Sequence, residues 1–263
     1  MRYSVFVLLL AAFFLLLPAP GFARPPLAGE VSVEIRPDNG AAFPSYPHQE
    51  FRSGGALVRK QFLEARKQEH YGIVIRNHSG ERVGVVIAVD GRNIITGKRS
   101  DLKPSEMMYI LDAWGEVNLA GWRTSDSEVH RFYFTEPADS YSVRTFGDTS
   151  AMGVIAVAAF REKERPLLPL EPKLKREAPA PSAAAGSSDK ARAEESAGTG
   201  FGDSSYSPVV HVAFEPERRP ASKTLIKYEW RETLCRKGII ACAPEQTNRL
   251  WDSEGYAPYP PKN

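Results

Sequence analysis

Short runs of β-forming residues, separated by turn residues at close intervals, constrain the fold of this chain more than any other feature. They follow one another from residue 71 to residue 160 with little helical periodicity. Asp90-Gly91 directly follows one of them and is a strong signal for a two-residue hairpin turn. Strands this short and this closely spaced predict an all-β fold, an antiparallel β-sandwich of the Ig-like or jelly-roll-like type, over residues 56–163. The runs are 71–76, 82–89, 93–96, 107–111, 117–123, 129–135 and 152–160.

Two regions bear on how the strands are placed. Residues 152–160 are apolar on both faces, which is typical of a central strand that is buried on both sides. Residues 57–69 fit a helical stripe as well as a strand. For this region we favour a strand at 62–66 that pairs with 71–76 across Lys67–His70.

Composition defines the segments on either side of the sandwich. Residues 24–55 are rich in proline, glycine and turn formers, and one alternating run at 31–35 predicts an edge strand. Residues 164–207 are dominated by proline, alanine, serine, glycine and charged residues. Such a segment lacks the apolar content that offsets ordering entropy, so we expect a disordered linker there.

The C-terminal segment, residues 208–263, combines two apolar runs with a proline-rich tail. Residues 209–214 and 224–230 have the alternation and branching typical of strands, and the prolines between them allow a turn, so they predict a β-hairpin. Two strands alone are marginally stable in water. We therefore expect this hairpin to dock on an edge or a face of the sandwich.

The two cysteines, Cys235 and Cys242, both lie in this C-terminal segment. In an oxidising compartment an isolated pair predicts a disulfide. The alternative is half of a zinc site, which needs two further ligands, and the nearest histidine in sequence is His211.

Residues 1–23 have the pattern of a secretory signal peptide. Arg2 gives a positive start, Val5–Leu17 is an unbroken apolar run, and small residues precede a cleavage position before Arg24. The run is shorter than the roughly 20 residues that span a bilayer, so we expect no integral membrane segment after cleavage. These features predict a periplasmic or secreted protein.

Charge and motifs argue against several classes of function. The 34 Lys and Arg residues nearly balance the 32 Asp and Glu residues, so no nucleic-acid partner is indicated. No Gly-x-Ser-x-Gly elbow, His-Glu-x-x-His motif or phosphate loop occurs, and we assign no catalytic residue, metal ligand or cofactor. We expect His130, on the strand face of Phe132 and Phe134, to be satisfied by a backbone carbonyl. Turn chemistry accounts for five aspartates: Asp90, Asp101, Asp112, Asp126 and Asp148.

Aromatic residues are the best candidates for a non-catalytic role. Four of them could form a surface on which a sugar or another ligand stacks, namely Trp114, Trp122, Tyr133 and Tyr141. The alternative for Trp122 is that it fills the sandwich core. Arg123 adjoins Trp122, and we expect Arg131 to lie nearby on a neighbouring strand. The predicted binding residues are Trp122, Arg123, Arg131 and Tyr133.

Several short motifs between residues 62 and 161 resemble a family of exported bacterial β-domain proteins of unknown function. They are Tyr71-Gly72-Ile73, Val89-Asp90-Gly91-Arg92-Asn93, Gly121-Trp122-Arg123, Arg131-Phe132-Tyr133-Phe134 and Met152-Gly153-Val154-Ile155. The resemblance implies a compact β domain. It implies no activity, so it transfers no catalytic residue to this chain.

From these observations we expect a non-catalytic exported module of the cell envelope that binds an envelope protein or a glycan. The alternative is a hydrolase that acts on cell-wall or extracellular polymer, with acids that only the fold brings together. A deep pocket with converging His, Asp or Glu side chains favours the enzyme. A shallow surface with exposed aromatic rings favours the binding module.

Overall fold

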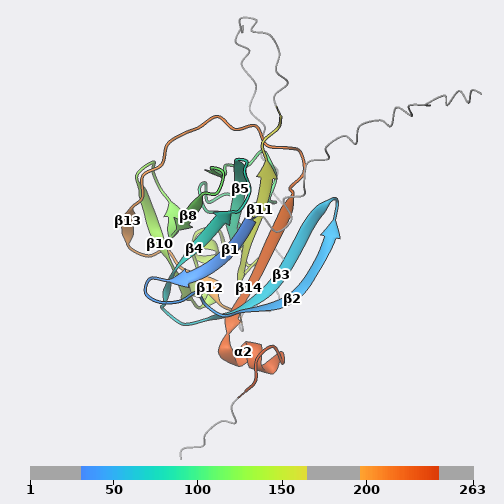
Figure 1. Ribbon diagram of the computed structural model, residues 1–263. Coiled ribbons are helices and arrows are strands. Elements are labelled where there is room, and N and C mark those ends of the chain that lie inside the picture. Colours follow the sequence, from blue (N-terminus) through green and yellow to red (C-terminus); the bar gives the residue numbers. More distant parts are fainter. Residues whose placement is uncertain (1–30, 165–195, 243–263) are drawn as a thin grey trace, which may run out of the picture.

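The computed structural model describes residues 31–164 and 196–242 (Figure 1). The predicted signal peptide at 1–23, most of the predicted linker and the proline-rich tail lie outside the described residues. Within the described ranges, no helix has the length and apolar character needed to cross a membrane.

Two open β-sheets of seven strands each pack together (Figure 1). Sheet one has the order β1-β4-β10-β12, with β8 beside β4 and with β9 and β13 beside β10. Its strands are β1 (Val31–Pro37), β4 (His70–Asn77), β8 (Glu116–Leu119), β9 (Gly121–Arg123), β10 (Glu128–Thr135), β12 (Gly198–Thr199) and β13 (Ser204–Tyr206).

Sheet two has the order β2-β3-β14-β11-β5-β6, with β7 beside β5. Its strands are β2 (Ser45–Ser53), β3 (Ala56–Ala65), β5 (Val83–Val89), β6 (Arg92–Asn93), β7 (Tyr109–Leu111), β11 (Val154–Arg161) and β14 (Ser222–Trp230). Short helices complete the described structure: η1 (Pro137–Asp139), α1 (Tyr141–Phe146) and α2 (Arg231–Arg236).

Aromatic rings from both sheets form the centre of the core. Tyr71 of β4 stacks on Phe134 of β10 with 4.3 Å between ring centroids, and on Phe132 with 5.3 Å. Tyr228 of β14 meets Phe134 from the other sheet at 5.2 Å. All four side chains are fully buried. Aromatic pairs of this kind contribute about 0.5–1.5 kcal/mol each beyond the burial of their area.

The structure confirms several local predictions. Asp90 and Gly91 have φ angles of 48° and 77°, as a two-residue hairpin turn requires, and Val89 pairs with Arg92 across them. β11 lies between β14 and β5, where a strand that is apolar on both faces belongs. β1 forms an edge of sheet one and pairs, among the described strands, with β4 alone.

The predicted pairing of 62–66 with 71–76 is wrong, although both segments are strands. β3 pairs with β2 and β14 in sheet two, whereas β4 belongs to sheet one. Leu63 and Tyr71 are both buried, and they contribute to one core cluster from opposite sheets. A hairpin would have placed both residues in one sheet. Gln68, with a φ of 62°, redirects the chain between the sheets.

The predicted C-terminal hairpin is also wrong. Residues 209–214 form no strand, and Val210 is 83% exposed. Residues 222–230 form β14, which lies inside sheet two, antiparallel to β11 and parallel to β3. The sandwich is therefore not purely antiparallel. This position buries Ile226 and Tyr228 completely, which an edge or a surface hairpin could not do.

The last part of the predicted linker, residues 196–207, is ordered. It contributes β12 and β13, which pair with β10. Its small residues lie where the neighbouring elements leave no space for a larger side chain. A Cβ on Gly198 would lie 2.8 Å from the Cβ of Ser140, and Ala197 is fully buried. Composition suggested disorder because small residues add little apolar area. The sandwich thus extends beyond 56–163 and includes strands from both flanking segments.

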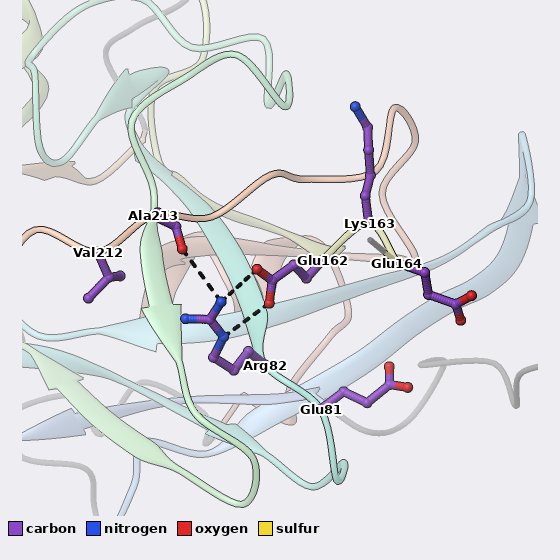
Figure 2. Close-up of a pocket in the computed structure, with 7 residues that line it drawn as sticks. All are labelled: Glu81, Arg82, Glu162, Lys163, Glu164, Val212 and Ala213. Atoms are coloured by element: carbon purple, nitrogen blue, oxygen red, sulfur yellow. Dashed lines mark hydrogen bonds and ion pairs between the residues drawn. The ribbon is translucent and has the colours of Figure 1, made fainter. Parts of the chain in front are cut away.

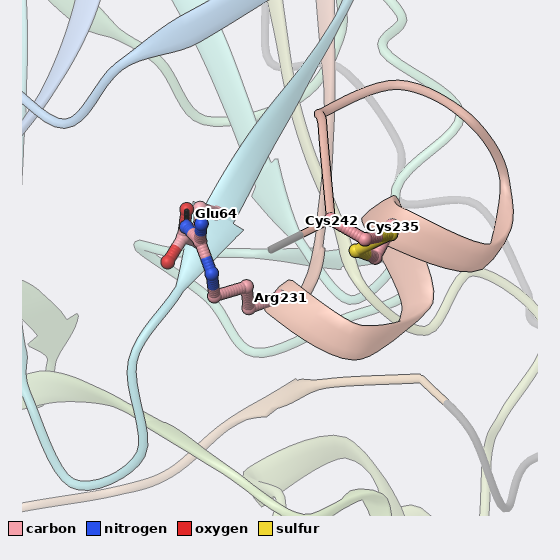
Figure 3. Close-up of a disulfide and its surroundings, with 4 residues drawn as sticks. All are labelled: Glu64, Arg231, Cys235 and Cys242. Atoms are coloured by element: carbon pink, nitrogen blue, oxygen red, sulfur yellow. Dashed lines mark hydrogen bonds and ion pairs between the residues drawn. A yellow bond between two sulfur atoms is a disulfide. The ribbon is translucent and has the colours of Figure 1, made fainter. Parts of the chain in front are cut away.

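The predicted disulfide between Cys235 and Cys242 is present, with 5.3 Å between the Cα atoms (Figure 3). It closes the loop that follows α2. The helix is fixed to the sandwich by the buried side chain of Leu234 and by an ion pair of 2.9 Å between Arg231 and Glu64 of β3 (Figure 3).

Candidate functional site

Trp122, the central residue of the predicted binding set, is buried. Its side chain is only 2% exposed and packs edge-on against Phe132. The indole Nε1 donates a hydrogen bond of 3.0 Å to the carbonyl of Gly200. The structure therefore supports the alternative interpretation, in which Trp122 fills the core.

The other three predicted binding residues have structural partners and do not share a surface with Trp122. The Arg123 guanidinium donates to the Tyr109 hydroxyl at 2.8 Å and to the Ser207 carbonyl at 2.9 Å. Arg131 forms an ion pair with Asp38. The Tyr133 ring packs against Gly200, where it leaves no space for a side chain. Arg131 and Tyr133 alternate with the buried Phe132 along β10, so they point to the opposite face of sheet one.

A row of aromatic rings leads from Trp122 to the molecular surface. The Tyr141 ring lies 4.6 Å from Trp122 and 5.2 Å from Phe201, and Phe201 stacks on His130 at 4.2 Å. His130 interacts through Nδ1 with the carbonyl of Gly202 at 2.8 Å, which is the kind of backbone partner that the sequence predicted.

The short helix α1 presents the outer end of this row. The Ser140 hydroxyl caps its N-terminus by accepting from the Val143 amide, and Gly147 ends it in the left-handed conformation, with a φ of 63°. Phe146, on its last turn, meets Tyr141 edge-on at 5.6 Å. Phe146 is 45% exposed and Phe201 is 39% exposed. Two apolar rings therefore face solvent, and both contact the Tyr141 ring.

A buried arginine borders these rings. Arg92 is only 9% exposed, and its guanidinium carbon lies 4.0 Å from the centroid of the Phe146 ring. It donates to Asp148 at 2.6 Å, while its Nε has no hydrogen-bond partner within the described residues. Burial alone would raise the pKa of Asp148, but hydrogen bonds from Ser150 and the charges of Arg92 and Arg99 hold it below its usual value.

We call this region the α1 surface, defined by Arg92, His130, Tyr141, Phe146 and Phe201. Sequence reasoning identified His130 and Tyr141 as candidates but missed the other three. Phe201 lay in a segment that composition assigned to a linker. For the other two residues the sequence carries only weak signals of a surface role. Phe146 is an apolar residue directly before Gly147, which ends the helix, and Arg92 is a charged residue inside the predicted hairpin.

A second cluster, around Asp90, is fully buried. Asp90 Oδ1 accepts from the Tyr228 hydroxyl at 2.5 Å and from the Gly153 amide at 2.8 Å, and Oδ2 accepts from the Thr199 amide at 2.8 Å. The Thr199 hydroxyl also lies 2.8 Å from the Tyr71 hydroxyl and 2.7 Å from that of Tyr228. Burial raises the pKa of Asp90 to about 6, although these hydrogen bonds oppose the increase.

Asp90 is therefore more than the turn residue that the sequence indicated. It joins β5, β11, β12 and β14, and it is only 1% exposed. A substrate cannot reach a carboxyl group that is buried and fully occupied in this way. The cluster is suited to holding the two sheets together.

A shallow hollow of about 700 Å³ lies at the end of β11 (Figure 2). Arg82 spans it with two hydrogen bonds to Glu162, of 2.6 and 3.0 Å, and reaches the Ala213 carbonyl at 3.5 Å. The carboxylate of Glu162 is thus bound by a fixed cation. The lining residues are Glu81, Arg82, Glu162, Lys163, Glu164, Val212 and Ala213.

Across residues 31–164 and 196–242, no group of three or more His, Cys, Asp or Glu side chains could hold a metal ion. No family model, curated protein or solved structure matches this chain.

Proposed function

We propose that this protein is a non-catalytic exported module of the cell envelope that binds its partner through the α1 surface. The observation that carries the proposal is the pair of exposed rings, Phe146 and Phe201, beside a buried arginine. The Arg92 guanidinium lies 4.0 Å from the centroid of the Phe146 ring, and its ion pair with Asp148 holds it there. Exposed aromatic rings beside an arginine are typical of protein recognition sites, where aromatic residues and arginine are enriched.

The exposed rings are held in place before any partner arrives. Tyr141 contacts both Phe146 and Phe201, and it packs in turn on the buried Trp122. Rings that are already immobilised lose little conformational entropy when they bind. Trp122 therefore acts in this proposal as a support for the contact residues.

The alternative is a hydrolase that acts on cell-wall or extracellular polymer. Glycoside hydrolysis needs two accessible carboxyl groups that face one another across the scissile bond. Asp90 is buried, and Glu162 is bound by Arg82. These contacts favour the binding module over the enzyme.

The location and partner class follow from the sequence. The pattern of residues 1–23 supports export to the periplasm or the medium, and the balanced charge supports an envelope protein or a glycan as the partner. The motifs that resemble exported bacterial β-domain proteins support the same assignment. An Ig-like or jelly-roll-like class is part of the proposal, with β14 as an inserted parallel strand.

Binding measurements with substituted protein test this proposal. Purified protein lacking residues 1–23 is titrated against isolated cell-wall polymer and against solubilised envelope proteins. Phe146→Ser combined with Phe201→Ser should weaken binding by roughly tenfold or more, because it removes both exposed rings. Trp114→Ser, which removes a ring that is 71% exposed elsewhere, is the matched control and should leave binding unchanged.

Equal binding by the double variant and the wild type would contradict the assignment of the α1 surface. Release of soluble fragments from the polymer, abolished by Glu162→Gln and retained by the double variant, would establish the hydrolase instead.

A further inference from the structure

The strand β2 forms a free edge of sheet two. Among the described strands it pairs with β3 alone, and it lies at the margin of the molecule (Figure 1). Eight of its nine residues are exposed, and only Tyr46 is half-buried. A long strand edge of this kind presents unpaired backbone groups to other chains.

The geometry of the β2–β3 hairpin identifies which backbone groups are unpaired. Gly54 and Gly55, with φ angles of 59° and 90°, form a two-residue turn, and Ser53 pairs with Ala56 across it. The residues that flank such a turn form a hydrogen-bonded pair, and pairs alternate along an antiparallel ladder. The amide and carbonyl groups of Arg52 and Glu50 therefore point away from β3, toward the free edge.

The usable edge is short and well defined. The register between β2 and β3 shifts between Pro47 and Gln49, so the regular part of the strand runs over residues 49–53. Proline and an irregularity of this kind discourage pairing at the other half of an edge. A partner strand can therefore engage only these residues, with Phe51 at their centre.

The sequence of this edge is complementary to itself. In an antiparallel pair of two copies centred on Phe51, Glu50 lies opposite Arg52 of the second copy, and the same contact recurs on the other side of the two-fold axis. These residues are the ones whose backbone groups face outward, so each opposed pair can exchange two hydrogen bonds. Phe51, which is 41% exposed, lies opposite its own copy at the closer spacing of a non-hydrogen-bonded pair.

The charges select this register over its neighbours. A shift by two residues in one direction places Arg52 opposite Arg52, and a shift in the other direction places Glu50 opposite Glu50. Both put like charges together. A shift by one residue places residues whose backbone groups face the free edge opposite residues whose backbone groups face β3. No ladder of hydrogen bonds can then form.

Contacts within the hairpin already position the pairing side chains. Arg59 of β3 holds Glu50 at 2.9 Å, and the Lys60 ammonium lies 5.5 Å from the centroid of the Phe51 ring. Arg52 of a second copy would add a second cation to Glu50 on the face where Arg59 lies. We propose that β2 is a homodimer edge, at which residues 49–53 of two copies join their second sheets into one continuous sheet.

Sedimentation equilibrium of the protein lacking residues 1–23 tests the proposal. The wild type should show a concentration-dependent monomer–dimer equilibrium. Glu50→Arg and Arg52→Glu should each weaken self-association by roughly tenfold or more, because both symmetric pairs become repulsive. Arg99→Glu, at an exposed position beside β6 at the opposite end of sheet two, changes the net charge by the same amount as Arg52→Glu and should leave the dimer unchanged.

An equimolar mixture of the Glu50→Arg and Arg52→Glu proteins separates pairing from misfolding. One copy then carries two arginines and the other two glutamates, so a heterodimer should form at least as tightly as the wild-type dimer. Monomeric wild type at every concentration would overturn the proposal. So would a dimer that both single variants retain, or a mixture of the two that stays monomeric while each variant melts like the wild type.

Discussion

The buried carboxyl group of Asp90 should make folding stability depend on pH in an unusual direction. Its pKa is about 6 in the folded protein, against an ordinary value of 3.8. A raised folded-state pKa means that the native state holds the proton more tightly than the unfolded chain. The stabilising contribution is therefore complete below pH 3.8 and is lost as the pH rises through 6.

The size of the effect follows from the two pKa values. They differ by about two pH units, and about 1.4 kcal/mol per unit gives roughly 3 kcal/mol between pH 4 and pH 7. Asp90→Asn removes the titration. The substitution also places the side-chain NH2 group of asparagine against the Thr199 amide, so that two donors face each other. The lost hydrogen bond should lower the free energy of unfolding by about 1–3 kcal/mol at every pH.

Urea unfolding at constant ionic strength between pH 4 and pH 8 measures both the pH-dependent contribution of Asp90 and the pH-independent cost of the substitution. The stability advantage of the wild type over Asp90→Asn should fall by most of these roughly 3 kcal/mol from pH 4 to pH 7 and then stay level. Asp101→Asn is the control, since Lys103 holds the pKa of the Asp101 carboxyl below its usual value and the dependence should have the opposite sign. An advantage that grows with pH would refute the reasoning, because it would mean that the hydrogen bonds to Asp90 outweigh its burial.

Three further outcomes are expected. A chain ending at residue 207 lacks β14, so it should show no cooperative thermal transition by circular dichroism; a transition at the full-length midpoint would contradict the central position of β14. Thr199→Val removes the hydroxyl between Tyr71 and Tyr228 and should lower the free energy of unfolding by about 1–3 kcal/mol, measured in urea, whereas Ser204→Ala at an exposed position should cost almost nothing. Cys235→Ser should cost about 2–3 kcal/mol by the same measurement, and reducing agent should then have no further effect on the variant.

Local chemistry made part of this fold predictable. The turn at Asp90-Gly91 needs positive φ angles at both positions, which aspartate and glycine tolerate, and the structure has them. The continuous apolar run at 152–160 could be stable only where both faces are covered, and β11 occupies such a place. The Cys235–Cys242 pair had no competitor in the chain.

Pairing partners and converging contacts were not predictable from the sequence. Alternation shows which face of residues 222–230 is buried but does not show which strands lie beside them, so the parallel contact with β3 was missed. Thr199 and Phe201 lie in a segment whose small residues suggested disorder, yet those residues are small because the neighbouring elements leave no space. The α1 surface draws on four separate segments, and no local pattern brings them together.

The place of β14 in sheet two also fixes when the fold can be completed. The hairpin of β2 and β3 is made early in the chain, but it joins the rest of its sheet only through β14, where Ser222 lies opposite Leu57. Contacts over such a long stretch of sequence form slowly, because the intervening chain must first be closed into a loop. A chain still emerging from a ribosome therefore holds two incomplete halves of sheet two. Both halves keep their edges open until residue 230 is free.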